Sequence, residues 1–129
     1  MSKKAVIYVR TSSERQGEKV SPVEQEADCR KYAAENDLTV INVYKDIERY
    51  RVKNKLVEPS GTRPDRPALL AMLRDAGQAQ FDVILAWRED RLYRGMRAML
   101  TVLETIQENK ITIMLARETF DAKMAPLKA

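Results

Sequence analysis

Apolar residues in this chain occur in short runs and in longer, helix-spaced patterns. The short runs are rich in β-branched and aromatic residues, which is typical of buried strands. The second run, LTVINVY, alternates apolar and polar residues and leads to Asp46. The pattern predicts four strands, at residues 5–9, 38–44, 81–87 and 111–115.

Three helices are predicted between these strands. Ser21-Pro22-Val23-Glu24 is a capping box with proline at the first helical position, and it begins a helix that reaches about residue 36. Asp65 is expected to cap a second helix over residues 67–76, which Gly77 ends. A third helix, over residues 94–109, carries apolar residues near helical spacing.

Residues 47–64 show no consistent periodicity and are expected to form a long exposed loop. The cationic side chains of this loop suit either contact with a polyanion backbone or simple solvation. They are Arg49, Arg51, Lys53 and Lys55.

The alternation of strands and helices predicts an α/β fold, with a mainly parallel sheet of four to five strands and helices on both faces. A ligand site in such a fold lies outside the carboxyl ends of the strands. Several charged residues follow predicted strand ends and therefore meet at this edge. They are Arg10, Asp46, Asp90, Arg91 and Arg94, together with Ser12.

The length and composition of the chain exclude several kinds of catalytic and metal site. The 129 residues are enough for one domain, residues 1–129, and the net charge of +4 allows a polyanionic partner without requiring one. With no histidine and one cysteine, Cys29, the chain cannot form an internal disulfide, a Cys-His pair or a Ser-His-Asp triad, and a zinc site is excluded. Cys29 is interpreted as a packed thiol, and Trp87 as a core or subunit contact.

The sequence contains neither an apolar run long enough to span a membrane nor a signal-peptide core, so we expect no membrane partner and an intracellular protein.

The segment AVIYVRTSSERQ places Arg10 two residues before Ser12, in a polar turn after a buried strand. Guanidinium groups hold phosphate oxygens and stabilise an alkoxide, so Arg10, Arg91 and Arg94 around a serine suit chemistry on a phosphate. Ser13 is a competing nucleophile on the same grounds. On local sequence alone, Ser12 fits more simply as a turn residue that bonds its own backbone.

A set of motifs covers nearly the whole chain in a fixed order: YVRTSSERQ, SPVEQ, YKDIE, RPDRPALLAML, DRLYRG and ETFDA. In this combination the chain resembles the catalytic domain of serine recombinases, the resolvase and invertase family. The long loop and the KYAAEND segment are most similar to the large serine integrases of phages and mobile elements.

The resemblance implies that Ser12 attacks a DNA phosphodiester to give a 5′-phosphoserine linkage and a free 3′-hydroxyl, before strand exchange and religation. It implies a catalytic set of Ser12, Arg10, Arg66, Asp90, Arg91 and Arg94, in which the arginines hold the phosphate and Asp90 orients them. Gln16 and Gln25 would support the active-site loop, and Asp46 would hold an arginine or take part in proton transfer. The family's chemistry needs no metal and no cofactor.

The resemblance also implies the partners, which are DNA and further copies of the chain in a dimer and a synaptic tetramer. Action on bacterial DNA implies a cytoplasmic location. Because the family continues beyond a segment like ETFDA into an oligomerisation helix and DNA-binding domains, we expect this chain to be a catalytic-domain fragment. Such a fragment would be inactive in isolation, would associate weakly and would have little sequence-specific DNA binding of its own, because the family binds DNA through the missing C-terminal domains.

Two other classes of protein fit parts of the sequence. A receiver or nucleotide-binding module would share the fold, but the chain lacks a glycine-rich phosphate loop, and arginine and serine stand where a receiver has acidic residues. A nuclease or nicking enzyme could use the same serine without religation. Only a recombinase leaves protein that can be trapped on the DNA end.

Overall fold

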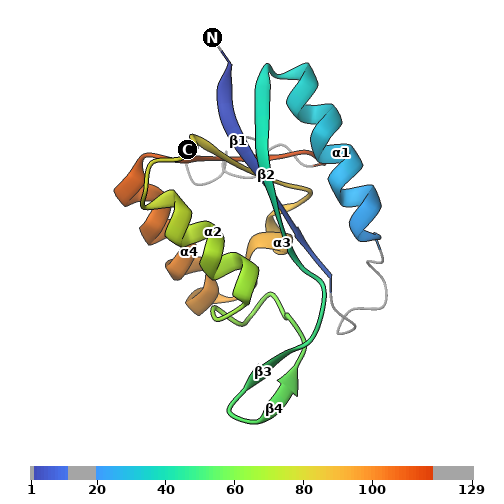
Figure 1. Cartoon of the computed structure of the whole chain (residues 1–129), viewed down its shortest axis with the longest axis vertical. Helices are drawn as coiled ribbons and strands as arrows, with labels where there is room; N and C mark the ends of the chain where they lie inside the picture. Colours follow the sequence, from blue (N-terminus) through green and yellow to red (C-terminus); the bar gives the residue numbers. More distant parts are fainter. Residues whose placement is uncertain (1, 12–19, 118–129) are drawn as a thin grey trace, which may run out of the picture.

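A four-stranded parallel sheet forms the centre of the computed structural model, which describes residues 2–11 and 20–117 (Figure 1). The described elements, in chain order, are β1 (Lys3–Arg10), α1 (Pro22–Glu35), β2 (Leu38–Asp46), β3 (Tyr50–Val52), β4 (Lys55–Val57), α2 (Pro67–Ala76), β5 (Val83–Ala86), α3 (Glu89–Leu92), α4 (Met96–Asn109) and β6 (Thr112–Leu115). The predicted strands and the first two helices are therefore confirmed, with ends that differ by a few residues.

The strand order of the sheet is β2-β1-β5-β6, and every pairing is parallel. From β1 the chain first moves to one side, to β2, and later returns to the other side, to β5. This reversal places a topological switch point between the carboxyl ends of β1 and β5, where ligands bind in open α/β sheets.

Side chains of β1 alternate between two hydrophobic layers. Val6 and Tyr8 face α2 and α4, whereas Ile7 and Val9 face α1. The whole of residues 5–10 is buried, as expected for a central strand covered on both faces. Helices on both faces of a parallel sheet were predicted, and this arrangement is confirmed.

Cys29 and Trp87, interpreted above from the sequence, both lie in the hydrophobic layer beneath α1. Cys29 is fully buried, and Trp87 is 8% exposed in the same hydrophobic cluster. The Trp87 indole donates a hydrogen bond to Asp28 (2.8 Å). The interpretations of Cys29 as a packed thiol and Trp87 as a core contact are confirmed.

The prediction of a long exposed loop over residues 47–64 is wrong, because Tyr50–Val52 and Lys55–Val57 pair as an antiparallel hairpin. Its side chains are exposed or half-buried on both faces, so no apolar alternation marked it in the sequence. Lys53 and Asn54 form the turn, both with positive φ (50° and 70°), as the type I′ hairpin turn requires.

The predicted cap of α2 is also wrong. The N-cap residue is Arg66, and the Asp65 carboxylate instead accepts hydrogen bonds from Tyr50 and Arg63. The amides at the start of α2 are bound by Asp46, from the end of β2. A cap supplied from another element leaves no local signature in the sequence.

The third predicted helix begins later than expected. Residues 89–92 form the separate turn of helix α3, and α4 begins at Met96 after Gly95. Gly95 has a φ of 79°, a left-handed conformation that glycine adopts without strain and that a continuous helix cannot include. This break lets the segment between β5 and α4 turn back toward the sheet edge.

Candidate active site

Five predicted site residues converge where β1 and β5 end. Arg10 is the last residue of β1, and Asp90 and Arg91 lie on α3, just after β5. Arg94 follows in the turn before α4, and Arg66 precedes α2. The sheet topology thus brings together residues that lie up to 84 positions apart, from Arg10 to Arg94.

Arg10 is fully buried, and backbone carbonyl groups surround its guanidinium group. Nε donates to the carbonyl of Arg91 (3.1 Å), Nη2 to that of Asp90 (2.8 Å) and Nη1 to that of Pro59 (3.3 Å). Burial, followed by the charge of Arg66, lowers the pKa of Arg10 to about 10. The group therefore remains cationic at neutral pH, and the carbonyl groups that bind it compensate its charge only as dipoles.

Asp90 lies between two further guanidinium groups. Its Oδ1 atom is 3.6 Å from Nε of Arg91, and its Oδ2 atom is 3.7 Å from Nη2 of Arg94. These separations are longer than hydrogen bonds, so the carboxylate attracts both arginines without a close bidentate pair. Arg91 also donates from Nη1 to the carbonyl of Arg10 (3.3 Å), which couples α3 to the end of β1.

Arg66 is buried behind this cluster and makes contacts of a different kind. Nη2 donates to the carbonyl of Leu92 (2.6 Å) and Nη1 to the carbonyl of Arg91 (3.3 Å), while Nε binds the carbonyl of Arg63 (2.8 Å). The last carbonyls of a helix carry partial negative charge and accept cations favourably. The geometry makes Arg66 the residue that fixes α3 in place.

Asp46 is nearly buried at the end of β2 and binds three hydrogen donors. It accepts from the amides of Ala68 and Leu69 (both 2.9 Å) and from the Tyr8 hydroxyl (2.6 Å). The same hydroxyl accepts from Nη1 of Arg66 (2.8 Å), so Tyr8 joins the carboxylate to that arginine. Asp46 was expected to hold an arginine, and among the described residues it reaches Arg66 through Tyr8.

Tyr8 itself was not singled out in the sequence. Burial is the largest of the effects that raise the pKa of Tyr8 well above its usual value. The neutral hydroxyl can therefore donate to Asp46 and accept from Arg66 at the same time. A tyrosine inside an apolar run gives no sign of this role.

Gln25, on α1, is fully buried and binds both sides of the segment that contains the predicted nucleophile. Its Nε2 atom donates to the carbonyls of Arg10 and Val20 (both 3.1 Å), and its Oε1 atom accepts from the amide of Arg10 (3.4 Å). Ser12, Ser13 and Gln16 lie outside the described residues.

Gly61 is a further site residue that the sequence did not indicate. Its carbonyl accepts the amide of Arg94 (2.8 Å). A Cβ atom at this position would lie 3.0 Å from Cγ of Arg94 and 3.2 Å from Nη2 of Arg10. The glycine therefore lets the backbone approach both arginines.

Metal chemistry has no ligand set in the described part of the chain, where no group of three or more His, Cys, Asp or Glu residues could hold an ion. The described helices also include none long and apolar enough to cross a membrane. What the described residues do assemble is several guanidinium groups with one loosely bound carboxylate. Such a group binds tetrahedral oxyanions and stabilises charge that develops on them.

Comparisons with known proteins identify the family of the chain. Residues 5–127 match the family described as Resolvase, N terminal domain. The N-terminal catalytic domain of TP901-1 integrase is similar in structure, with a TM-score of 0.76 and 29% identity over 98% of this chain and 88% of that one.

Two more distant structures share the fold. The C-terminal catalytic domain of ISC1926 TnpA, an IS607-like serine recombinase, has a TM-score of 0.68 and 23% identity, over 97% of this chain and 78% of that one. A resolvase family site-specific recombinase from Streptococcus pneumoniae has a TM-score of 0.70 and 20% identity, over 97% and 83%. The predicted family is confirmed: this chain belongs to the resolvase family and is the catalytic domain of a site-specific recombinase.

Proposed function

We propose that this chain cleaves and rejoins DNA through a covalent bond between Ser12 and a DNA 5′-phosphate. The observation that carries the proposal is the position of Arg10, two residues before Ser12, in a buried cluster with Arg91 and Arg94 nearby. The cluster supplies a place for a phosphodiester next to the segment that bears the serine. Residues 1–129 act in this proposal as one catalytic domain.

The proposed reaction conserves the phosphoester. The Ser12 oxygen loses its proton and forms a bond to phosphorus, and the bond from phosphorus to the 3′ oxygen breaks. That oxygen takes up a proton and leaves as a 3′-hydroxyl. Religation is the reverse attack, by a 3′-hydroxyl of a new partner strand. Each step makes one phosphoester bond for each one that it breaks, so neither ATP nor a metal ion is needed.

The arginines divide into two roles in this proposal. Arg91 and Arg94 neutralise the charge that grows on the non-bridging oxygens, together with Arg10, and Asp90 orients Arg91 and Arg94. Arg66 and Asp46 are positioning residues, which act through the carbonyls of α3 and the start of α2. Gln25 and Gln16 are assigned to support of the nucleophile segment.

The partners follow from the same mechanism. Exchange between two DNA sites needs four cleaved strands and four serines, so the proposal includes a dimer on each site and a tetramer when two sites meet. The DNA of a bacterial host places the reaction in the cytoplasm. A nuclease would share the first step and would differ by releasing the DNA end.

Covalent trapping tests the proposal. The chain is fused to an oligomerisation helix and a sequence-specific DNA-binding module, and it is incubated with duplexes that are nicked so that the cleaved strand diffuses away. The protein on the remaining strand is then digested and its DNA adduct located by mass spectrometry. Ser12→Ala and Ser13→Ala are measured in parallel.

An adduct on Ser12 that is lost in Ser12→Ala and kept in Ser13→Ala is the expected result. An adduct on Ser13, or cleavage that persists in Ser12→Ala, would overturn the assignment of the nucleophile. Cleaved DNA without any bound protein would instead indicate a nuclease.

A further inference from the structure

The β3–β4 hairpin extends away from the rest of the described chain, at the lower end of the view in Figure 1. Neither strand contributes a residue to the two hydrophobic clusters of buried residues. A groove of about 560 Å³, lined by residues 45–50, Pro67 and Ala68, lies between the root of the hairpin and the start of α2. The turn and the contacts at its root therefore stabilise the hairpin, and packing of apolar side chains contributes little.

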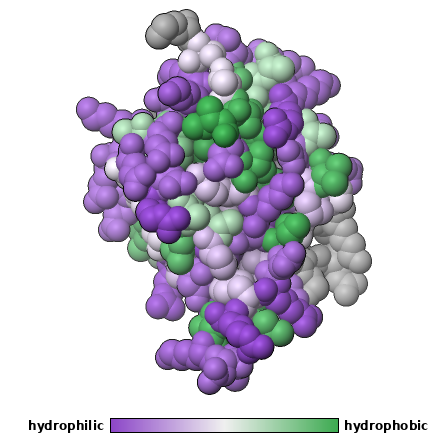
Figure 2. Space-filling model, viewed as in Figure 1, coloured by the Kyte–Doolittle hydropathy of each residue, from purple (hydrophilic) through white to green (hydrophobic). Residues whose placement is uncertain are grey.

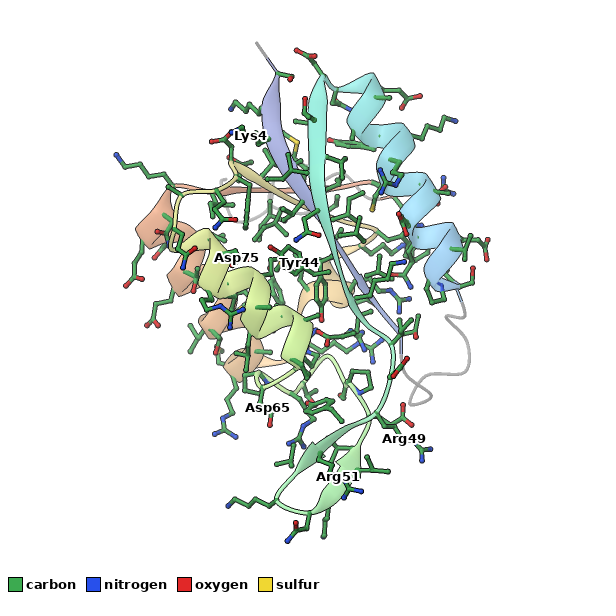
Figure 3. The ribbon with its side chains drawn as sticks, viewed as in Figure 1. Lys4, Tyr44, Arg49, Arg51, Asp65 and Asp75 are labelled. Atoms are coloured by element: carbon green, nitrogen blue, oxygen red, sulfur yellow. The ribbon has the colours of Figure 1, made fainter. Side chains whose placement is uncertain are left out.

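The charged side chains of the hairpin are all positive. Residues 50–57 read YRVKNKLV and contain Arg51, Lys53 and Lys55 but no acidic residue. All three cations are exposed, and none of them forms an ion pair with another described residue. Figure 2 shows this end of the molecule mostly in the hydrophilic colours, and Figure 3 places the labelled Arg51 on the hairpin.

The residues at the root of the hairpin behave differently. Arg49 forms a salt bridge with Glu58 across the hairpin's root (2.8 Å). Tyr50 donates to Asp65, which Arg63 also binds. Cations at the root are thus matched by carboxylates, whereas those nearer the tip are presented to solvent.

The turn carries a lysine in a conformation that lysine does not favour. Lys53 has a φ of 50° and Asn54 a φ of 70°, where asparagine and glycine are the usual residues. Asparagine or glycine at residue 53 would suit the backbone better and would remove the charge at the tip. The sequence therefore keeps a cation at this point at the expense of turn stability.

The hairpin is joined directly to the arginine cluster. Two residues after β4, the Pro59 carbonyl binds Arg10, and the Gly61 carbonyl binds the amide of Arg94. A three-residue strand spans about 10 Å, and phosphates of one DNA strand follow each other every 3.4 Å or so along the helix axis. The distance from the root of the hairpin to its tip therefore equals about three base-pair steps of a DNA duplex.

From these observations we propose that the β3–β4 hairpin binds the sugar-phosphate backbone of duplex DNA beside the phosphate held by the arginine cluster. The contact is electrostatic and independent of base sequence, through Arg51, Lys53 and Lys55. This proposal rests on the proposed function, since it takes DNA as the substrate. The competing explanation is that the cations only keep an exposed edge from pairing with other chains, as charged edge strands often do.

Substitution of Lys53 separates these explanations, and the chain offers a matched control. Lys110 is also exposed and also left-handed (φ 54°), at the C-cap of α4 just before β6. Lys53→Asn and Lys110→Asn therefore make the same change of charge in the same backbone conformation, on the hairpin and at the opposite, amino-terminal edge of the sheet. Both are expected to raise the midpoint of thermal unfolding.

Affinity of the chain for a fluorescently labelled duplex of arbitrary sequence is measured by anisotropy from 50 to 300 mM NaCl. Loss of one phosphate contact reduces the slope of log K against log salt by about 0.9, which corresponds to roughly 8-fold weaker binding at 0.1 M salt. Lys53→Asn should show this loss, and Lys110→Asn should not. Combining Lys53→Asn with Arg51→Ala and Lys55→Ala should reduce the slope by about 2.7.

Equal affinities of Lys53→Asn and Lys110→Asn would overturn the hairpin proposal, as would a parent chain that binds no duplex at 50 mM salt. These outcomes leave the covalent assignment of Ser12 untouched, because trapping is measured separately. Conversely, hairpin-dependent binding without any covalent adduct would overturn the proposed reaction and leave the hairpin as a DNA contact.

Discussion

Replacing Gly61 with alanine tests whether the arginine cluster depends on a close approach of the backbone. The added methyl group would lie 3.0 Å from Cγ of Arg94, 3.2 Å from Nη2 of Arg10 and 3.3 Å from Cζ of Arg10. Non-bonded carbon atoms ordinarily keep about 3.5–4.0 Å. The methyl group is therefore too close to its nearest carbon neighbour by roughly 0.5–1 Å.

The two arginines differ in their freedom to move. The Arg94 side chain is partly exposed, whereas Arg10 is fully buried and hydrogen-bonded to three carbonyl groups. Gly61 is not in the left-handed region, so alanine adds no backbone strain there. Overpacking of this kind costs about 1–3 kcal/mol of the free energy of unfolding.

The effect on catalysis follows from displacement of the guanidinium groups. A misplacement of about 1 Å in an active site can cost roughly 100-fold in rate, so a shift of half that size is expected to cost roughly 10-fold. The rate of covalent adduct formation by the fused chain in a single turnover measures this effect, and urea unfolding of the chain measures the stability. Both should decrease in Gly61→Ala.

Gly77→Ala is the matched control, because Gly77 has an ordinary helical φ of −66° at the end of α2. A methyl group there meets only carbonyls of its own helix, at 3.3 and 4.0 Å. This variant should react at the parent rate. The reasoning about Gly61 is refuted if Gly61→Ala forms the adduct as fast as Gly77→Ala does and unfolds at the same urea concentration.

Three further predictions concern buried polar groups. Asp46→Asn should lower the free energy of unfolding by about 1.5–3 kcal/mol in urea, because the amide NH₂ would face hydrogen donors that now bind a carboxylate; an unchanged midpoint would contradict the role of Asp46 as the cap of α2. Burial and the hydrogen bond to Asp75 raise the pKa of Tyr44 to about 12 from its ordinary value near 10. The stability that this neutral hydroxyl contributes is fully present below pH 10 and is lost as the pH rises toward 12. In Tyr44→Phe the stability should therefore decrease less between pH 10 and 11 than in the parent, and equal decreases would refute the assignment; Figure 3 labels both Tyr44 and Asp75. Burial raises the pKa of Cys29 to about 12, so a disulfide reagent at pH 8 should label the native thiol roughly 1,000-fold more slowly than the urea-unfolded one, and fast labelling of the folded chain would contradict its burial.

The sheet and its helices were predictable because their signals are local. The run AVIYV is apolar at every position, as a strand covered on both faces must be. The capping box Ser21-Pro22-Val23-Glu24 began α1 at the expected residue, and both of its hydrogen bonds are present. Elements that have a buried face, or that begin at a specific capping residue, can therefore be predicted from residues close together in the sequence.

The hairpin and the cap of α2 were missed for the opposite reason. Residues 50–57 bury little, so they have no apolar alternation, and a Lys-Asn turn is weaker than the usual Asn-Gly signal. The cap of α2 comes from Asp46, which lies 22 residues before the amide it binds first. Contacts of this kind depend on the sheet topology, so they cannot be predicted from the spacing of residues in the sequence.

The candidate site shows the same division. Arg10, Asp90 and Arg91 could be placed together because each follows a predicted parallel strand, and such ends share one edge. Tyr8 and Gly61 could not, since one lies within a core pattern and the other within a turn. Their roles depend on atoms from segments far apart in sequence, namely Asp46 and Arg66 for Tyr8, and Arg10 and Arg94 for Gly61.

The way in which the arginines are held bears on what they can do. Carbonyl oxygens compensate a guanidinium group only as dipoles, whereas a carboxylate at hydrogen-bond distance would cancel its charge. Arg10 and Arg66 are bound by carbonyls, and Asp90 stays 3.6 and 3.7 Å from Arg91 and Arg94. Burial is the largest effect that lowers the pKa of Arg10, and repulsion from Arg66 is the next. A bound phosphate group would relieve that repulsion, and it would do so most strongly when its own negative charge is greatest. In the proposed reaction this relief favours the more highly charged transition state over the ground state, which is the differential binding that catalysis requires.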